Sequence, residues 1–585
     1  MDGTFGLLIL TTALAGPPSA PASGPAGDPR DVRHGLVIPD EGYCDQPYVV
    51  VRPDGAWVCT MTTGRGVEGQ RGQHVVATIS DDRGRSWSPP IDIEPADGPE
   101  ASWAVPLITP GGRIYVFYDY NGDRIDRLGD KNIRADMLGW YVFRYSDDGG
   151  RTWSARRYRL PVRVTACDRE NDWRGQVQIL WGICKPIVVG DTVFFSFTKL
   201  GRYMLENGEG WLFRSDNLLT ARRPEEIEWR MLPDGEHGIR APEFGSVQEE
   251  HNIVALANGD LYCMYRTTTG SPCHTYSRDG GRTWTRPVHA TYRPGGPRIK
   301  HPRACPRIWR TSGGRYLLWY HNHGGRDFEG RNPAWIAGGL ERNGHIWWSQ
   351  PEILLYDRDP KTRMSYPDLI EQDGRFWVTE TQKEIARVHE IDASLLEGLW
   401  NQLAGRRGPA PHPVLRWTAD HAPEVTMPRV PLLRDGGGFS IEMRLRLDRL
   451  DAGQIVLDSR DDAGRGVALQ TTPAGTLAIE LSDGRIRWSW DCDPGLLVAG
   501  RAHHITVIVD GGPRIITFVV DGRLCDGGES RPCGWGRFRE ALGDVNGTAP
   551  LRVAPSLNGR VELLRVYDRY LRTSEAVSLA LADGA

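Results

Sequence analysis

A short polar motif recurs along this chain, and it constrains the fold more than any other feature of the sequence. The pattern S-x-D-x-G-x-S/T-W begins at Ser80, Ser146 and Ser277. Each copy follows a segment of alternating apolar and polar residues, as expected of a β-strand. Asp and Ser side chains bind backbone groups of turns, and glycine supplies a positive φ. Each copy therefore predicts a hairpin turn that closes a pair of strands.

The spacing of the motif predicts how many strands each repeat contains. Degenerate copies begin near Ser215 and Leu340. The five starts are separated by about 62 to 69 residues, which suits a four-stranded propeller blade with long loops. Residues 31–404 hold six such units. We therefore predict an all-β protein whose residues 31–404 form a six-bladed β-propeller.

This motif is the Asp box, and with this spacing residues 31–404 resemble the sialidase (neuraminidase) superfamily of β-propellers. The resemblance implies the fold strongly and the function weakly. The box is a turn far from the active site, and it also occurs in propellers that are not enzymes.

A change of composition marks a second domain. Residues 405–414 are rich in Gly, Pro and Arg and are interpreted as a linker. Residues 415–585 return to short strands, among them HHITVIVDG and GRVELLRVYDRYL. These segments resemble a laminin-G/concanavalin A-like jelly-roll domain. Such a module either binds carbohydrate or packs on the propeller as a structural support.

The N-terminus and the cysteines bear on the compartment. Residues 5–15 form an apolar run that is followed by small residues, as in a signal peptide, so residues 1–30 are predicted to be a signal peptide and disordered tail of a secreted protein. In an exported protein the local pairs Cys167/Cys184, Cys263/Cys273 and Cys525/Cys533 could form disulfides. The alternative is that they are buried thiols.

The overall composition excludes some partners. The chain has 71 basic and 75 acidic residues, a net charge of −4, which argues against a broad basic face for nucleic acid. No apolar run approaches the roughly 20 residues that span a bilayer. Tryptophan (21) outnumbers phenylalanine (13), and these rings serve either as core residues or as platforms for sugars. The expected partner is a polysaccharide or glycoconjugate.

The sialidase resemblance implies a set of site residues in chain order. Glu250 resembles the glutamate that activates the nucleophile, and Tyr366 resembles the tyrosine nucleophile itself. Arg266 and Arg331 resemble two of the three arginines that hold the substrate carboxylate. Glu380 resembles the late glutamate of the family. A planar guanidinium pairs with both oxygens of a carboxylate, which suits an acidic sugar.

Two positions in the first blade depart from the family. Asp45-Gln46-Pro47 stands where the family has Arg-Ile-Pro, and Asp45 would repel a carboxylate. No aspartate precedes Ser80 at the place of the acid/base, where Glu68 and His74 are the titratable residues. A sialidase would need another arginine near the axis, and the candidates considered are Arg52, Arg71 and Arg174.

Histidines suggest a second chemistry. Several fall in predicted inner strands or axial loops: His74, His251, His301, His321 and His323. Histidine is a natural acid or base near neutrality. With Tyr366 and the arginines it suits β-elimination on a uronic acid. The surrounding segments are similar to propeller lyases of rhamnosyl-glucuronate, with His74 as the leading acid/base and His251, His321 and His323 binding substrate.

The sequence therefore predicts an enzyme that cleaves a terminal glycosidic bond at an acidic sugar, slightly favouring a lyase or unusual glycosidase. The alternatives are a retaining exo-sialidase, a non-catalytic glycan-binding propeller and a protein-interaction scaffold. No cofactor is expected, although a structural calcium ion is left open. A metal bound by His321 and His323 with Asp327 and Glu329 is a further alternative.

Overall fold

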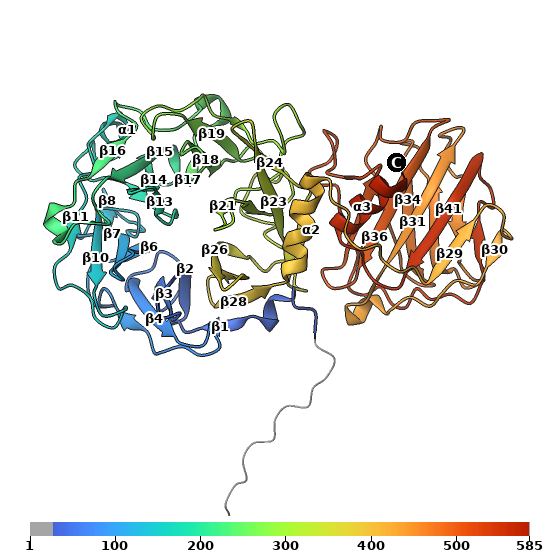
Figure 1. Cartoon of the computed structure of the whole chain (residues 1–585), viewed down its shortest axis with the longest axis horizontal. Coiled ribbons are helices and arrows are strands. Elements are labelled where there is room, and N and C mark those ends of the chain that lie inside the picture. The colour runs from blue at the N-terminus through green and yellow to red at the C-terminus, as the bar shows by residue number, and fades with distance from the viewer. Residues whose placement is uncertain (1–26, 584–585) are drawn as a thin grey trace, which may run out of the picture.

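The computed structural model describes residues 27–583, which form two β-rich domains side by side (Figure 1). The first is a ring of six sheets, each in contact with the next, and the sixth contacts the first. The all-β, six-bladed prediction is confirmed. The predicted signal peptide lies largely outside the described residues, so it stays a prediction. Between residues 27 and 583 no helix has the length and apolar character to cross a bilayer.

The first three blades follow one another along the chain. Blade one contains β2 (Tyr43–Val51), β3 (Trp57–Gly64), β4 (His74–Ser80) and β5 (Ile91–Asp92). Blade two contains β6 (Ala101–Ile108), β7 (Ile114–Tyr120), β10 (Trp140–Ser146) and β11 (Tyr158–Arg159), with a small hairpin of β8 (Arg127–Leu128) and β9 (Lys131–Asn132). Blade three contains β12 (Leu180–Trp181), β13 (Ile187–Val189), β14 (Thr192–Arg202), β15 (Glu206–Ser215) and β16 (Arg230–Leu232). In each blade the first strand lies nearest the axis.

The other three blades complete the ring. Blade four contains β17 (Glu249–Ala255), β18 (Leu261–Arg266), β19 (Cys273–Ser277) and β20 (Val288–His289). Blade five contains β21 (Arg307–Arg310), β22 (Tyr316–Tyr320), β23 (Ala334–Arg342), β24 (His345–Trp348) and β25 (Glu352–Leu355). Blade six contains β26 (Ser365–Gln372), β27 (Arg375–Thr381), β28 (Ala386–Ile391) and the N-terminal β1 (Leu36–Ile38). Because β1 pairs with β28, the two ends of the domain close the ring.

The Asp boxes form the predicted turns after β4, β10 and β19. In the first, the Asp82 carboxylate accepts from Ser86 N and Oγ at 2.8 and 2.6 Å, and Gly84 N donates to Ser80 Oγ at 2.8 Å. The other two boxes repeat these bonds. The hydrogen bonds from Ser86 lower the pKa of Asp82 to about 2.

The helices are short and lie beside the sheets. They are α1 (Ala166–Glu170), α2 (Ala393–Ala404) and α3 (Thr573–Asp583), with 3₁₀ turns at Val32–His34, Pro224–Glu226, Pro242–Phe244 and Leu433–Asp435. Helix α2 is capped by Asp392, whose side chain accepts from Ser394 N, and it ends at Gly405 in the left-handed conformation. The expected linker of residues 405–414 therefore begins where this helix stops.

The second domain is a sandwich of two sheets. One contains β29 (Leu415–Thr418), β41 (Gly559–Tyr567), β31 (Gly438–Leu447), β36 (Ala502–Asp510), β37 (Ile515–Val520), β38 (Arg523–Leu524) and β39 (Gly536–Arg537). The other contains β30 (Glu424–Val425), β40 (Leu551–Val553), β32 (Ile455–Asp458), β33 (Arg465–Thr471), β34 (Leu477–Asp483) and β35 (Arg487–Asp491). Alternate residues such as Val467, Leu469, Ile505 and Val507 fill the space between the sheets.

The ten cysteines are all free thiols, and nine of them are buried. The pairs Cys167/Cys184, Cys263/Cys273 and Cys525/Cys533 are therefore not bonded, and the alternative of buried thiols holds. Burial raises the pKa of the Cys44 and Cys167 thiols, so these groups stay protonated at neutral pH.

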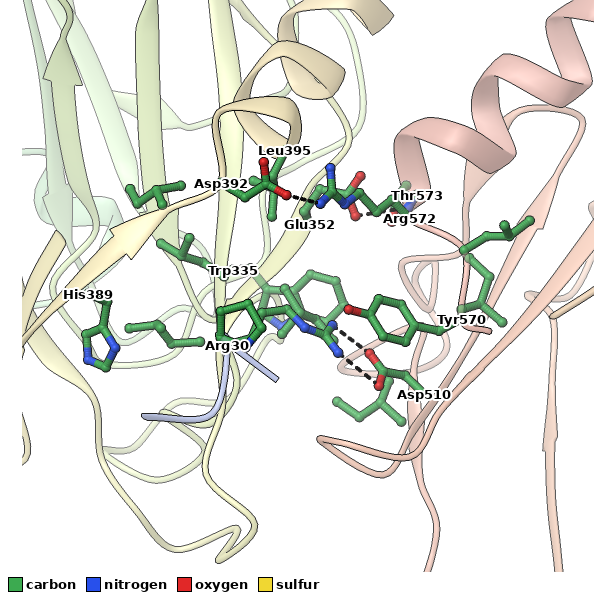
Figure 2. Close-up of a pocket in the computed structure, with 18 of the residues that line it drawn as sticks. Arg30, Trp335, Glu352, His389, Asp392, Leu395, Asp510, Tyr570, Arg572 and Thr573 are labelled. Atoms are coloured by element: carbon green, nitrogen blue, oxygen red, sulfur yellow. Dashed lines mark hydrogen bonds and ion pairs between the residues drawn. The ribbon is translucent and has the colours of Figure 1, made fainter. Parts of the chain in front are cut away.

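The two domains are joined by a buried ionic contact (Figure 2). Arg30 lies between the rings of Tyr356 and Tyr570, at 5.5 and 3.9 Å, and donates to Asp510 Oδ2 at 2.7 Å. Arg572 of the second domain pairs with Asp392 of the first at 2.6 Å. Residues 28–30, expected in the disordered tail, are thus part of the interface between the domains.

We expect Arg30→Ala to destabilise the protein by about 3 kcal/mol, since it leaves the buried Asp510 carboxylate unpaired. Calorimetric unfolding measures this loss. Arg33→Ala is the matched control, because the Arg33 side chain is 57% exposed and, among residues 27–583, pairs with Asp31 only. Equal effects of the two substitutions would show that the contact does not join the domains.

Candidate active site

Four inner strands carry the same distortion at the same end of the ring. β2, β6, β17 and β26 each have a β-bulge near their first residues. At each bulge one residue has a positive φ: Gln46 (53°), Trp103 (64°), Glu250 (57°) and Tyr366 (43°). Positive φ in non-glycine residues costs energy and gathers at functional sites. The bulges therefore point to a site at this end of the axis.

Glu250 and Tyr366 meet there, although they lie 116 residues apart. The Tyr366 hydroxyl donates to Glu250 Oε1 at 2.6 Å, and both side chains are buried. Burial and the nearby Glu250 carboxylate raise the pKa of Tyr366. The phenol therefore keeps its proton until a base takes it, and Glu250 is the base within reach.

Three arginines surround this pair. Arg266, at the end of β18, donates through Nε to Glu249 Oε2 at 3.0 Å and lies 2.8 Å from Glu250 Oε1 through Nη1. Arg331 donates to the Arg303 carbonyl at 3.1 Å. Arg303 lies 3.5 Å from the other oxygen of Glu249. The predicted Arg266 and Arg331 are thus joined by Arg303, which no sequence motif marks.

Phe328 covers the three guanidiniums. Its ring centre lies 5.9 Å from Arg266, 4.4 Å from Arg303 and 5.6 Å from Arg331. Beneath it, Arg303 Nε and Nη2 and Arg331 Nε are buried and donate no hydrogen bond within residues 27–583. Buried donors are rarely left unpaired. A carboxylate would satisfy them better than the ring does, because charged hydrogen bonds are stronger than cation–π contacts.

A pair of carboxylates lies on the other side of Tyr366. The Lys383 ammonium is 2.6 Å from Asp45 Oδ2, 3.3 Å from Glu68 Oε2 and 4.5 Å from the centre of the Tyr366 ring. Arg134 pairs with Glu68 at 2.8 Å. Asp45 is therefore neutralised by Lys383 and does not act as the isolated negative charge expected from the sequence.

The environments of these two carboxylates push their pKa values apart. Burial raises the pKa of Asp45 more than Lys383 lowers it. Burial also acts on Glu68, but Lys383 and Arg134 together lower its pKa to about 2. Burial thus favours the protonated form of Asp45, whereas Glu68, whose side chain is 31% exposed, is ionised.

The structure places two predicted residues away from this cluster. His74 lies on β4, the third strand of blade one, where Nδ1 bonds the Glu94 carbonyl at 2.8 Å and Nε2 bonds Glu41 at 3.0 Å. Glu380 is fully buried on β27 and lies 3.5 Å from His389. Its neighbours Thr379 and Thr381 face β2, so Glu380 faces the opposite side of the sheet.

The predicted axial histidines bind backbone rather than an open pocket. His251 stacks on Tyr265 and bonds the Ile239 carbonyl at 3.1 Å, and burial lowers its pKa to about 3. His321 bonds the Pro333 carbonyl at 3.2 Å, and His323 bonds the Gly330 carbonyl at 2.7 Å. These two residues shape the 321–333 segment that carries Phe328 and Arg331. The described residues contain no group of three His, Cys, Asp or Glu arranged for a metal.

None of the three replacement arginines considered from the sequence joins the cluster. Arg52 pairs with Asp54, and Arg71 pairs with Asp126. Arg174 is exposed in the turn after α1. Arg303 is the arginine that the structure brings beside Arg266 and Arg331 instead.

The second domain supports the 321–333 segment from outside. Trp535 Nε1 donates to the Asn322 carbonyl at 3.0 Å, and Arg537 donates to the Asn332 carbonyl at 2.7 Å. Gly324 N donates to the Pro532 carbonyl at 2.7 Å. The two ends of the segment are thus held by one loop of the jelly roll, which fixes where Phe328 and Arg331 lie.

Comparisons with protein families agree with this architecture. Residues 97–378 match the BNR repeat-like domain, and residues 420–577 match the concanavalin A-like lectin/glucanases superfamily. The chain carries a BNR repeat-like domain and a concanavalin A-like domain. The predicted resemblance is confirmed at this level. No curated protein matches the chain in sequence.

Solved structures similar to this chain include three sialidase-type proteins. A Hadza microbial sialidase, Hz136, is 17% identical over 62% of this chain and 68% of its own, with a TM-score of 0.44. A Trypanosoma rangeli sialidase in complex with sialic acid is 13% identical over 95% and 96%, with a TM-score of 0.41. An intramolecular trans-sialidase from Ruminococcus gnavus is 13% identical over 63% and 99%, with a TM-score of 0.45.

Proposed function

We propose that the protein is a retaining exo-glycosidase that removes a terminal acidic sugar from a glycan. The observation that carries the proposal is the Tyr366–Glu250 hydrogen bond of 2.6 Å beside three arginines, two of which, Arg303 and Arg331, have unpaired donors within residues 27–583. A tyrosine hydroxyl held by a base is an activated nucleophile. Arginines with free donors are suited to hold a carboxylate on the sugar.

The residues suffice for a balanced two-step reaction. Glu250 takes the Tyr366 proton, the phenolate oxygen bonds to the anomeric carbon, and the bond from that carbon to the leaving oxygen breaks. The Asp45–Glu68 pair gives its proton to the leaving oxygen. Water then attacks the anomeric carbon, and the bond from that carbon to the Tyr366 oxygen breaks. The hydroxyl of the water stays on the sugar, and its proton goes to the carboxylate pair. Glu250 returns the first proton to the phenolate.

This assignment differs from the lyase that the sequence slightly favours. His74, the leading acid/base of that hypothesis, bonds Glu94 and Glu41 on the third strand of blade one. Tyr366 could serve as the base of an elimination, so the lyase remains an outcome of the test rather than the proposal.

The test is incubation of the purified protein with a terminal sialoside and, separately, with a rhamnose-capped glucuronan such as gum arabic. Release of the free acidic sugar with retained configuration supports the proposal, whereas release of the neutral rhamnose cap alone would contradict it. Rising ultraviolet absorbance from an unsaturated uronate product would instead show elimination. Binding of acidic glycans with no turnover on either substrate would support a non-catalytic glycan-binding propeller.

We expect Trp535→Ala to lower kcat/KM for the acidic substrate about tenfold, because small displacements of a positioning group are costly. The substitution removes the hydrogen bond to Asn322 and loosens the 321–333 segment. Trp535→Phe should retain much of the activity. Trp488→Ala is the control, since Trp488 packs on the core of the jelly roll. Equal losses from Trp535→Ala and Trp488→Ala would contradict a positioning role.

We also propose that the protein acts outside the cell, on the basis of the apolar run at residues 5–15. Mass spectrometry of the N-terminus of protein from culture medium would test this. An intact N-terminus on protein retained in the cells would contradict it.

A further inference from the structure

A groove on the outer edge of the propeller takes no part in the chemistry above. It lies between blades four and five, beside β19, β20, β24 and the hairpin of residues 291–298, and it has a volume of about 600 Å³. Tyr366 and Glu250 lie on inner strands, whereas this groove is lined by outer strands. It is therefore separate from the axial site.

The groove is basic in a protein whose net charge is −4. The described residues that line it include no Asp or Glu, and the basic ones are Arg278, Arg286, Arg293, Arg298, His274, His289 and His345. Arg278 and Arg286 are paired with Asp260 and Glu243. Within residues 27–583, neither Arg293 nor Arg298 makes a side-chain hydrogen bond or ion pair. Two exposed guanidiniums thus remain free to pair with a ligand.

The histidines add hydrogen-bonding groups rather than charge. Burial, and then repulsion by His345, lower the pKa of His274 to about 4. Burial and the nearby Arg298 lower the pKa of His289. Both imidazoles are therefore neutral at pH 7, and the positive charge of the groove comes from its arginines.

Arg293 also lines a second cavity of about 310 Å³, next to the first. The wall of this cavity includes Tyr292 and Trp347 of the propeller and Arg523 of the second domain, which pairs at 3.5 Å with Asp526 of the same wall. The Arg342 guanidinium lies over the Trp347 ring, 5.0 Å from its centre. Aromatic rings offer flat apolar faces, which can stack on the apolar face of a sugar. The two cavities thus combine cations for carboxylates with a platform for sugar rings.

We propose that this groove binds an extended anionic polysaccharide of the uronate type. Its carboxylates pair with Arg293 and Arg298, and one sugar ring lies on Trp347. Exposed ion pairs contribute little singly, so the site depends on several contacts along one chain. The groove holds a polymer to the protein without taking part in the bond cleavage at Tyr366.

The test measures binding of a purified oligogalacturonate to the full-length protein by calorimetry, with a neutral malto-oligosaccharide of equal length as the reference. We expect binding of the acidic chain only, weakened by salt. The double variant Arg293→Ser/Arg298→Ser should weaken it about tenfold, and Trp347→Ala should also weaken it. Arg85→Ser/Arg151→Ser is the control with the same change of charge, since both arginines are exposed on the Asp boxes of blades one and two.

The outcomes separate this proposal from the enzyme assignment. Binding that survives Tyr366→Phe but fails in the groove variant supports a separate site, whether or not the axial site cleaves sugars. Equal weakening by the groove and control variants would mean attraction to surface charge in general and would overturn the proposal. Unchanged binding in the groove variant would overturn it as well.

Discussion

Replacing Tyr366 with phenylalanine is expected to lower kcat by at least about 10⁴-fold, the order of loss seen when an enzyme loses its nucleophile. The substitution removes one oxygen and keeps the ring, which lies 6.4 Å from the ring of Trp103 and 4.5 Å from the Lys383 ammonium. Substrate binding should therefore change little, because the arginines are untouched. Turnover and binding are measured separately, the latter by calorimetry with the intact substrate.

Two further variants sharpen this prediction. Tyr48→Phe is the matched control, since the Tyr48 hydroxyl on β2 is also buried but has no hydrogen-bond partner within residues 27–583. It should keep most of the activity. Glu250→Gln keeps the shape of the base but cannot accept the proton, so its loss should approach that of Tyr366→Phe and should not add to it. Substantial turnover by Tyr366→Phe would exclude tyrosine as the nucleophile.

The resemblance to sialidases implied the order Glu250, Arg266, Arg331, Tyr366, and the Asp boxes fix the position of each blade that carries these residues. A box marks the turn after the third strand, so the first and second strands before it are located to within a few residues. Glu250 and Arg266 precede the box at Ser277 by the length of one hairpin, and in the structure β17 and β18 are that hairpin.

The direction of the histidine side chains could not be predicted, because the face on which a strand residue lies depends on the register of the strand. His251 follows Glu250 directly in the chain. The bulge at Glu250 determines which of these two side chains points toward the axis of the propeller. Since adjacent residues in a strand point to opposite faces, His251 does not share the face of Glu250 and stacks on Tyr265 of the neighbouring strand β18. A bulge has no sequence signature here, so this outcome was not predictable from the pattern.

The missed residues come from loops. Arg303 lies in HPRACPRIW, between blades four and five, where one arginine among many in the chain carries no distinguishing pattern. Lys383 lies in the turn between β27 and β28, and its role depends on Asp45, 338 residues away. Neither pairing is encoded in local periodicity. One available signal was Asp45 itself, since a buried carboxylate on an inner strand requires a compensating cation.

Substitution of Arg303 tests most directly whether the site selects sugars that carry a carboxylate. Within the part of the chain that the structure describes, its Nε and Nη2 are buried without hydrogen bonds, and its one ion pair is with Glu249, at 3.5 Å. We expect Arg303→Gln to weaken transition-state binding of an acidic sugar by about 3 kcal/mol, since it removes one partner of a desolvated charge pair. This corresponds to a loss of about 10²-fold in kcat/KM.

The loss should depend on the substrate charge. A substrate whose carboxylate is replaced by an amide has no charge for Arg303 to pair with, so Arg303→Gln should change its kcat/KM several-fold at most. Arg310→Gln is the control, because Arg310 is exposed at the far end of β21. If both substrates lose equally, Arg303 supports the fold of the site rather than the carboxylate. In that case Arg266 and Arg331 would be the cations that bind the sugar carboxylate, and the variant would keep its selectivity for acidic sugars.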